Sequence, residues 1–580
     1  MTFYSSSSLV RFLLLCSLIP QTTSAPTKVT PAPTVTLASG IIIGATATPT
    51  NQTSIKASAN VYLGVPFAQS PPERFSPPKA ALAWSSPLMA QAFKPTCIQQ
   101  FMGTGEARRK NIEYFNNPPS NQGPEESEDC LYLNVYTPPN LTTKSKKAVM
   151  FWLYGVRTTD PKIMFPTDNS RVTWLLVVQG FLVTMEHPSL SAKMSLWSLL
   201  TTAQIVSSHA PFIPLNSYLT YFTLVFGFSN SPEIPFGSQN AGFLDQRFAL
   251  QWVQDNIAQF GGDPARVMIF GESAGGESVK QLLANPPSPL PFSSAILQSQ
   301  NAVLTGNGTA NYLQVLKKFS CTDIACLRKV PAEDIKAYIE PNSLAFPPVD
   351  GDGTSTQDVR PNIMSGKFAN VPTMFGSNLN EARVFLDAAG LKGGNASNTT
   401  LITVFNSYGI TSKTDREGIL ALYASQHFTD PYDVADRIFT DMVFTCTTAR
   451  LADYLAQAGR TTYRYLYTPS FPSTTLFMNS GAYHASEIPE VFRTYPLTGK
   501  FGAVTKQQIK LSTFMQKTWA NFAKDPARGV GWPKLGSAKG KELGVLGVNG
   551  STGVTVKAQL ATDYACPLYA QAEDAAKLSF

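Results

Sequence analysis

The chain has 580 residues, of which 43% are hydrophobic and only 15% are charged. This composition is that of a packed globular protein, and the length allows one large domain or several. The formal net charge is +7, with the basic residues scattered along the chain, and the longest basic cluster is Lys144, Lys146 and Lys147. Because nucleic-acid-binding proteins concentrate basic residues on one face, we expect no nucleic-acid partner.

The first 25 residues have the layout of a secretory signal peptide. Arg11 precedes an apolar run over 12–19, and Thr23-Ser24-Ala25 supplies small residues for cleavage. The apolar run is too short for a membrane span, so we expect a secreted, extracellular protein without an integral membrane span. Residues 26–54 are rich in Pro, Thr and Ala and predict a loose, solvated leader ahead of a domain over 55–570.

Cysteines and glycosylation motifs agree with export. Removal of Cys16 with the signal leaves six of the seven cysteines, and an even number in an exported chain predicts disulfides, although six cysteines allow 15 pairings. Buried free thiols are the alternative. Six Asn-X-Ser/Thr triplets predict glycosylation of a secreted protein. The cysteines are Cys97, Cys130, Cys321, Cys326, Cys446 and Cys566, and the asparagines are Asn51, Asn140, Asn307, Asn395, Asn398 and Asn549.

Strand and helix patterns alternate along most of the chain. A helix is predicted over 242–260, which Gly261-Gly262 should end before Asp263-Pro264 turns the chain. Strands that alternate with helices favour an α/β fold with a mainly parallel sheet flanked by helices. The apolar patterns predict strands over 61–65, 131–136, 148–154 and 267–270, and helices over 242–260 and 274–284.

One stretch, from about 156 to 222, differs from its surroundings. It contains a long apolar run over 174–183 and clustered Ser and Thr, but few helical faces and no strand–turn–helix order. Gln179, Gly180 and Glu186 interrupt the apolar run, which is too short for a membrane span.

Ser273 lies in the segment Gly271-Glu272-Ser273-Ala274-Gly275, a G-x-S-x-G motif. A buried strand is predicted to run directly into this motif, and a helix is predicted to leave it. In that context the sharp turn exposes the serine hydroxyl and directs a backbone N–H at the reacting carbonyl. We therefore predict that Ser273 is a nucleophile; the alternative is a structural strand–helix turn with an inert serine.

A serine nucleophile needs a base, and histidine is the usual one near neutral pH. His187 and His209 precede the serine and lie in the unusual stretch. His427 is expected at a helix end, where a solvated or capping role is favoured. His484 lies in a loop of small residues over 481–489 that could bring an imidazole to the sheet edge. The chain order nucleophile, acid, histidine favours His484.

The acid of such a site lies between Ser273 and His484 and should follow a core strand. Residues 371–375 are predicted as that strand, and Glu381 follows it within a short segment. Glu381 is therefore the candidate acid, with Asp387 as the nearest rival; a solvent-exposed Glu381 is the alternative.

Together these segments resemble the type-B carboxylesterase/lipase family. The resemblance is carried by 260–264 with 270–276 around the serine, by 128–135, by the strand motif 62–68, and by the helix over 239–257. It implies an α/β-hydrolase fold with large insertions that hydrolyses small-molecule or lipid esters without a cofactor. It also implies Glu381 as the triad acid and His484 as the triad histidine. The cysteines and histidines do not show the spacing of a zinc site, and no metal is predicted.

The resemblance implies disulfide pairings as well. Cys97–Cys130 would close a loop that flanks the substrate gorge, Cys321–Cys326 would close a short loop, and Cys446–Cys566 is the remaining pair.

The chain departs from the family pattern at the oxyanion hole. Family members follow the strand with His or Tyr and three glycines, whose N–H groups hold the developing oxyanion. Here Tyr154-Gly155 begins that pattern, but Val156 and Arg157 stand where the next two glycines should be. The predicted donors are thus Ala274, which follows the nucleophile, with Gly155 and Val156 from the altered loop. A catalytically silent member of the fold that binds a partner is the alternative function.

The family pattern resumes at 225–228. Our hypothesis is that 156–222 comes from a faulty gene model, such as a retained intron or a shifted frame, and a lineage-specific insertion is the alternative. An uninterrupted messenger that encodes this very stretch would contradict the hypothesis.

Overall fold

The computed structural model describes most of the chain beyond the amino terminus. The predicted signal peptide and most of the unusual stretch lie outside the described residues. The described residues are 31–47, 58–100, 105–116, 126–155, 175–179, 225–300, 307–391, 401–402, 404–405, 410 and 412–570. One compact unit comprises Pro33–Phe580.

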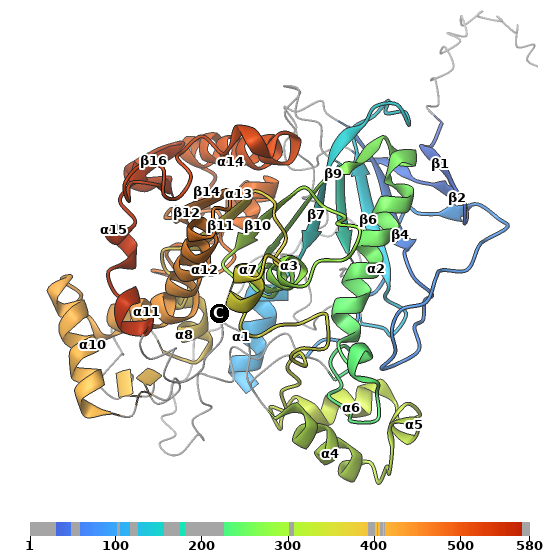
Figure 1. Ribbon diagram of the computed structural model, residues 1–580, viewed down its shortest axis with the longest axis horizontal. Helices are drawn as coiled ribbons and strands as arrows, with labels where there is room; N and C mark the ends of the chain where they lie inside the picture. The colour runs from blue at the N-terminus through green and yellow to red at the C-terminus, as the bar shows by residue number, and fades with distance from the viewer. Residues whose placement is uncertain are drawn as a thin grey trace, which may run out of the picture. The chain divides into compact units, whose positions relative to one another are not determined.

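An 11-stranded sheet forms the centre of this unit, in the order β16-β15-β12-β11-β10-β9-β7-β8-β6-β4-β3 (Figure 1). Seven neighbouring strands from β15 to β8 run parallel, while both ends of the sheet are antiparallel. The strands are β3 Ala45–Ala47, β4 Ala59–Pro66, β6 Tyr132–Thr137, β7 Lys147–Leu153, β8 Leu175–Gln179, β9 Gly262–Glu272, β10 Ser294–Gln298, β11 Thr373–Asn378, β12 Thr462–Tyr467, β15 Leu543–Leu546 and β16 Val554–Lys557. A mostly parallel sheet with helices on both faces confirms the predicted fold class.

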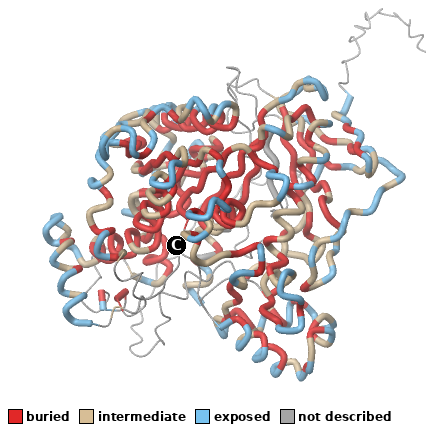
Figure 2. Tube along the Cα trace, in the orientation of Figure 1, coloured by how far each residue is buried: buried red, intermediate tan, exposed pale blue. Residues whose placement is uncertain are grey.

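Each face of the sheet contributes to a separate apolar core. In β9, Val267 and Ile269 belong to one core, whereas Met268 and Phe270 belong to the other. This alternation follows from the two-residue period of a strand. The central strands are correspondingly buried along their length (Figure 2).

Helices cover both faces. The first core includes residues of α2 (Ala241–Asn256), α3 (Ala274–Ala284) and α12 (Cys446–Gln457). The second includes residues of α13 (Ile488–Phe492) and α14 (Lys506–Lys524). The other helices are α1 Gly105–Asn116, α4 Gly308–Lys318, α5 Ile324–Leu327, α6 Ala332–Ile339, α7 Arg360–Met364, α8 Arg383–Ala388, α10 Lys413–Ser425, α11 Pro431–Thr440 and α15 Leu560–Asp563, with short 3₁₀ turns η3 Phe236–Ser238, η4 Ile257–Phe260, η6 Pro526–Arg528 and η7 Val548–Gly550.

The elements predicted around the serine are present with small changes in their ends. The helix predicted over 242–260 is α2 followed by the 3₁₀ turn η4, and α3 has the predicted bounds 274–284. The expected turn at Asp263-Pro264 is wrong, because β9 begins at Gly262. The register of β9 against β7 shifts near this point, and the Ala265 N–H donates to Asp263 Oδ1. The local irregularity is therefore part of the strand.

The loose leader predicted over 26–54 is also wrong in part. Residues 34–37 form β1 (Thr34–Leu37), which pairs with β2 (Gly40–Ile43), and β2 in turn pairs with β5 (Leu88–Met89). Val35 and Leu37 are buried while Thr34 and Thr36 are exposed. This two-residue alternation is a strand signal that the Pro- and Thr-rich composition obscured.

Strand β8 lies inside the unusual stretch. It pairs in parallel with β7 and antiparallel with β6, and so occupies the position between them. No strand was expected there from the sequence. The rest of 156–222 lies outside the described residues.

Candidate active site

Ser273 lies on a sharp turn between the end of β9 at Glu272 and the start of α3 at Ala274. Its backbone has φ 56° and ψ −120°, a strained conformation for a residue with a side chain. The turn is held by the Ser273 N–H, which donates to Gln298 O at 2.9 Å. A Cβ on Gly275 would lie 1.9 Å from Leu153 O, so only glycine fits directly after the turn. The predicted strand–serine–helix geometry is thus present.

Gly155, which follows β7, packs directly against this turn. A Cβ there would lie 2.1 Å from Glu272 O and 2.7 Å from Ala274 N. The Ala274 N–H belongs to the first residue of α3, and the first N–H groups of a helix have no acceptor within that helix. The structure therefore places two of the three predicted oxyanion donors, Gly155 and Ala274, next to each other. Val156 lies outside the described residues.

His484 lies against Glu381. The imidazole Nδ1 is 2.7 Å from Glu381 Oε2, and both side chains are fully buried. A carboxylate only accepts hydrogen bonds, so Nδ1 carries the proton and donates, which leaves Nε2 as the acceptor of the neutral ring. The other oxygen of Glu381 accepts from Ser299 Oγ and from the Asn378 N–H, each at 2.6 Å. These contacts fix the orientation of both the acid and the imidazole.

The second nitrogen of His484 faces the nucleophile turn. Its Nε2 is 3.2 Å from Oε1 of Glu272, the residue that precedes Ser273, and Glu272 is fully buried. No role for Glu272 is predicted from the sequence. The glutamate inside the G-x-S-x-G motif was visible in the sequence, but only the fold shows that it meets the histidine.

A third buried glutamate, Glu487, lies behind this pair. Asn378 Nδ2 donates to its Oε2 at 2.6 Å, and Gln298 Nε2 donates to its Oε1 at 3.0 Å. Trp519 Nε1 in turn donates to Gln298 Oε1 at 2.9 Å. Burial, followed by the nearby charge of Glu381, raises the pKa of Glu487. Asn378 thus connects Glu487 with Glu381 through its side chain and its backbone N–H. This network was not predicted from the sequence.

The rival candidates have other surroundings. Asp387 accepts from Lys110 Nζ at 2.7 Å and from the Tyr114 hydroxyl at 2.5 Å, which ties α8 to α1. His427 is exposed just after α10, with a φ of 67°, in keeping with the expected solvated role. His187 and His209 lie outside the described residues.

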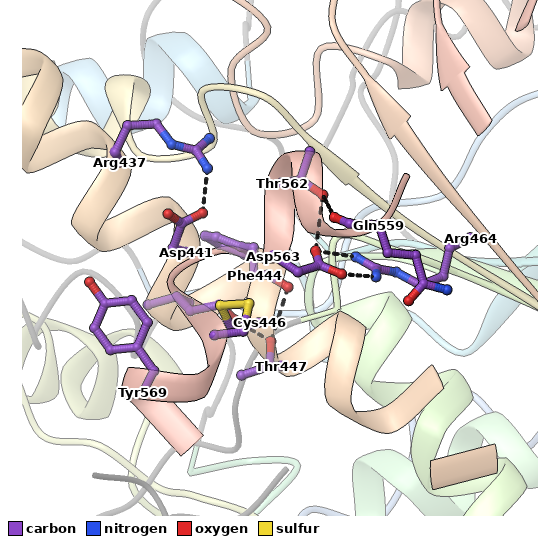
Figure 3. The surroundings of a disulfide bond; sticks show 12 residues. Arg437, Asp441, Phe444, Cys446, Thr447, Arg464, Gln559, Thr562, Asp563 and Tyr569 are labelled. Atoms are coloured by element: carbon purple, nitrogen blue, oxygen red, sulfur yellow. Dashed lines mark hydrogen bonds and ion pairs between the residues drawn. A yellow bond between two sulfur atoms is a disulfide. The ribbon is translucent and has the colours of Figure 1, made fainter. Parts of the chain in front are cut away.

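Three disulfides are present, with the pairing that the family resemblance implies. They join Cys97 to Cys130, Cys321 to Cys326, and Cys446 to Cys566. The last pair links the start of α12 to the segment after α15 and lies beside Tyr569 and Phe444 (Figure 3). Buried free thiols are therefore excluded for these six residues.

Of the six predicted glycosylation sites, Asn140, Asn307 and Asn549 are exposed to solvent. Asn307 caps α4, where its Oδ1 accepts from the Ala310 N–H at 2.9 Å and its Nδ2 could carry a glycan. Asn51, Asn395 and Asn398 lie outside the described residues.

Among the described residues, the helices are all too short or too polar to cross a membrane. The same residues contain no group of three or more His, Cys, Asp or Glu side chains that could hold a metal ion.

Comparison with known proteins agrees with the fold. The Carboxylesterase family matches residues 31–160 and 220–560, and so leaves 161–219 outside the match. Rabbit (Oryctolagus cuniculus) liver carboxylesterase 1 is 30% identical over 540 residues, which cover 85% of this chain and 86% of the relative. Mouse (Mus musculus) carboxylesterase 1E is 29% identical over 542 residues, which cover 83% of this chain and 84% of the relative. The chain therefore belongs to the carboxylesterase family, as a carboxylic ester hydrolase with the α/β-hydrolase fold.

Proposed function

We propose that this protein is a secreted serine esterase in which Ser273, His484 and Glu381 carry out acyl transfer. One arrangement supports the proposal above all others. The imidazole held by Glu381 at Nδ1 directs its Nε2 to the strained turn that bears Ser273.

In the first step, Ser273 Oγ attacks the ester carbonyl while His484 Nε2 takes the serine proton. The carboxylate of Glu381 holds the ring in the required tautomer and stabilises the imidazolium that forms. The Ala274 and Gly155 N–H groups, and that of Val156, would face the developing oxyanion. The alcohol then leaves with the proton from His484, and Ser273 remains acylated.

In the second step, water attacks the acyl-enzyme. His484 Nε2 takes a proton from that water, and the carboxylic acid leaves as the proton returns to Ser273 Oγ. The two steps together consume one ester and one water and release one alcohol and one carboxylic acid, and they return the enzyme to its starting state.

The substrate class follows from the family rather than from a mapped pocket. The relatives named liver carboxylesterase 1 and carboxylesterase 1E support a small-molecule or lipid carboxylic ester. Rates on p-nitrophenyl esters of increasing acyl length would separate an esterase, with a maximum at short chains, from a lipase, with a maximum at long chains.

Secretion is proposed on the signal-like segment over 1–25, the three disulfides and the exposed sequons. Expression in a eukaryotic host tests this proposal. The protein should appear in the medium with its first residues removed, and endoglycosidase treatment should lower its apparent mass. Retention in the cell with an intact N-terminus would contradict it.

A second function is a catalytically silent binding protein, which one observation favours. Val156 and Arg157 replace the glycines that would give the oxyanion loop its freedom.

Hydrolysis of short-chain p-nitrophenyl esters separates the two functions. The wild type should exceed Ser273→Ala by at least about 10⁴-fold in kcat, because removal of a triad nucleophile typically has this effect. Ser425→Ala, which removes a hydroxyl from an exposed position at the end of α10, is the control and should match the wild type. A wild-type rate equal to that of Ser273→Ala would favour the binding protein.

A further inference from the structure

Two phenylalanines pack next to the imidazole of His484. The ring centroids of Phe444 and His484 are 4.7 Å apart, and those of Phe385 and His484 are 5.1 Å apart. The Phe385 and Phe444 rings are themselves nearly parallel, at 6.3 Å. All three side chains are buried, with Phe444 only 1% exposed. The imidazole that contacts Glu381 is thus bounded by aromatic rings from α8 and from the segment after α11.

Phe444 reaches this position from an unusual local structure. Residues Asp441–Thr445 form a π-helical turn, η5, between α11 and α12, and the Cys446 N–H donates to Asp441 O. Such turns are rare, widen the helix by one residue, and often occur at functional sites. An uninterrupted α-helix would rotate Phe444 to a different direction, because successive α-helical residues are 100° apart.

Several buried contacts hold the π-helical turn. Arg437 Nη2 donates to Asp441 Oδ1 at 2.5 Å, and the Tyr423 hydroxyl donates to Asp441 Oδ2 at 2.9 Å. The hydroxyls of Tyr423 and Tyr569 are 2.9 Å apart. Figure 3 shows Arg437 and Asp441 joined on one side of Phe444, with the Cys446 disulfide and Tyr569 nearby. The wide turn is therefore anchored on a charged residue pair and a disulfide.

Helix α11, which precedes the π-helical turn, also contacts the segment that contains Glu381. Arg437 Nη1 donates to Leu379 O at 2.9 Å, and the Ala382 N–H donates to Thr440 Oγ1 at 3.2 Å. Leu379 and Ala382 flank Glu381. Helix α11 and the π-helical turn thus position both Glu381 and the Phe444 ring that packs on the imidazole.

We propose that Phe444 is a positioning residue for ester hydrolysis, which fixes the plane of the His484 imidazole against Glu381 and keeps water from that pair. This inference rests on the proposed function of His484. The Phe444 ring centroid also lies 4.7 Å from the imidazole that becomes positively charged when it takes the serine proton, and a cation within about 6 Å of an aromatic ring is stabilised. Excluding water strengthens the Glu381–imidazolium attraction at that moment.

Simple core packing is the competing explanation, and the chain offers a matched control. Phe439 on α11 is fully buried and belongs to the same aromatic group, with ring distances of 5.5 Å to Phe385 and 6.3 Å to Phe444. Phe439→Leu and Phe444→Leu remove the same ring from the same core. A role in packing alone predicts similar effects on activity.

The test compares kcat, KM and thermal midpoint for the wild type, Phe444→Leu and Phe439→Leu on a short-chain p-nitrophenyl ester. Phe444→Leu should lower kcat at least about tenfold, with KM within about twofold. Phe439→Leu should keep kcat within about twofold at a similar loss of thermal midpoint. Phe444→Met, which fills the same space without a branched side chain, replaces Phe444→Leu if that variant does not fold, with the same expected loss of kcat.

The two proposals fail in different ways. A wild type no faster than Ser273→Ala overturns the proposed function, and this inference with it. An active wild type whose Phe444 variants keep their kcat overturns the inference alone. Equal losses of kcat in the Phe444 and Phe439 variants also overturn it.

Discussion

Glu272 Oε1 and His484 Nε2 face each other at 3.2 Å, although 211 intervening residues separate them in the chain. The nitrogen that would accept the proton of Ser273 thus has a buried carboxylate beside it. Glu381 and Glu272 contact opposite nitrogens of one ring. A neutral imidazole so placed gains most from both carboxylates when it becomes positively charged.

Replacing Glu272 by Gln should lower kcat about tenfold with little effect on KM. The carboxylate stabilises the imidazolium that exists only along the reaction, and a tenfold change corresponds to about 1.4 kcal/mol. Steady-state kinetics on p-nitrophenyl acetate measure the change. Glu417→Gln, which removes the same charge from an exposed position on α10, should leave kcat unchanged. An unaltered kcat in Glu272→Gln would contradict this reading of the contact.

Gly155→Ala should lower kcat by about 10² or more and also lower the thermal midpoint. Its Cβ would lie 2.1 Å from the backbone oxygen of Glu272, so β7 or the nucleophile turn must move, and the oxyanion donors would move with it. Gly418→Ala is the control, since a Cβ on this α10 residue meets no atom within 4 Å. That variant should be as active as the wild type and equally or slightly more stable. Full activity in Gly155→Ala would show that the backbone there adapts freely.

Asp441→Asn should change how stability depends on pH. Burial raises the pKa of Asp441 from 3.8 to about 6 in spite of its pairing with Arg437. Between pH 4 and 6 the unfolded chain therefore loses this proton while the folded protein keeps it, so the carboxyl lowers stability as pH rises. The whole difference is about 3 kcal/mol and is constant above about pH 6.

Asparagine does not titrate, so Asp441→Asn lacks this dependence. Relative to the wild type, its thermal midpoint should rise from pH 4 to pH 6 and then level off. Melting curves at half-unit steps of pH measure the difference. Parallel curves for the two proteins would show that the pKa of Asp441 is the same in the folded and the unfolded chain, and would contradict the prediction.

Removal of the Cys446–Cys566 disulfide should destabilise the protein more than removal of Cys321–Cys326. Cys446–Cys566 closes a loop with a sequence separation of 120 residues, and Cys321–Cys326 closes a loop with a separation of 5. Loop-closure entropy gives about 5 kcal/mol for the longer loop and about 2 kcal/mol for the shorter. Double Cys→Ala variants, compared by urea unfolding, test the order. A larger loss from the short loop would indicate that native contacts rather than loop entropy decide the effect.

The parts of the site that depend on local pattern were predictable from the sequence. The turn at Ser273 follows from an apolar strand, flanking glycines and a helix, all within about twenty residues. Glu381 was placed because it follows a core strand, and β11 does end at Asn378. His484 was chosen by chain order and by its loop.

What could not be predicted depends on contacts between distant segments. Neither Glu272 nor Glu487 shows from its neighbours that it is buried beside the acid and the histidine. The π-helical turn cannot be predicted from hydrophobic periodicity either. Its one extra residue leaves the apolar spacing within α11 and within α12 unchanged. The strands at 34–47 lie in a Pro- and Thr-rich segment whose composition indicates a loose leader, although the alternation of buried and exposed residues in 34–37 is that of a strand.

Strand β8 has a consequence for how the gene is read. Strands β6 and β7 are both paired with β8, which lies between them in the sheet order of the described residues. Simple excision of 156–222 from the messenger would take Leu175–Gln179 with it and divide the sheet into a three-stranded and a seven-stranded part. If the hypothesis of a shifted frame is right, the corrected frame should therefore encode a replacement strand of about five residues. If it is a retained intron, its removal without replacement would leave β6 and β7 without the strand that pairs with both.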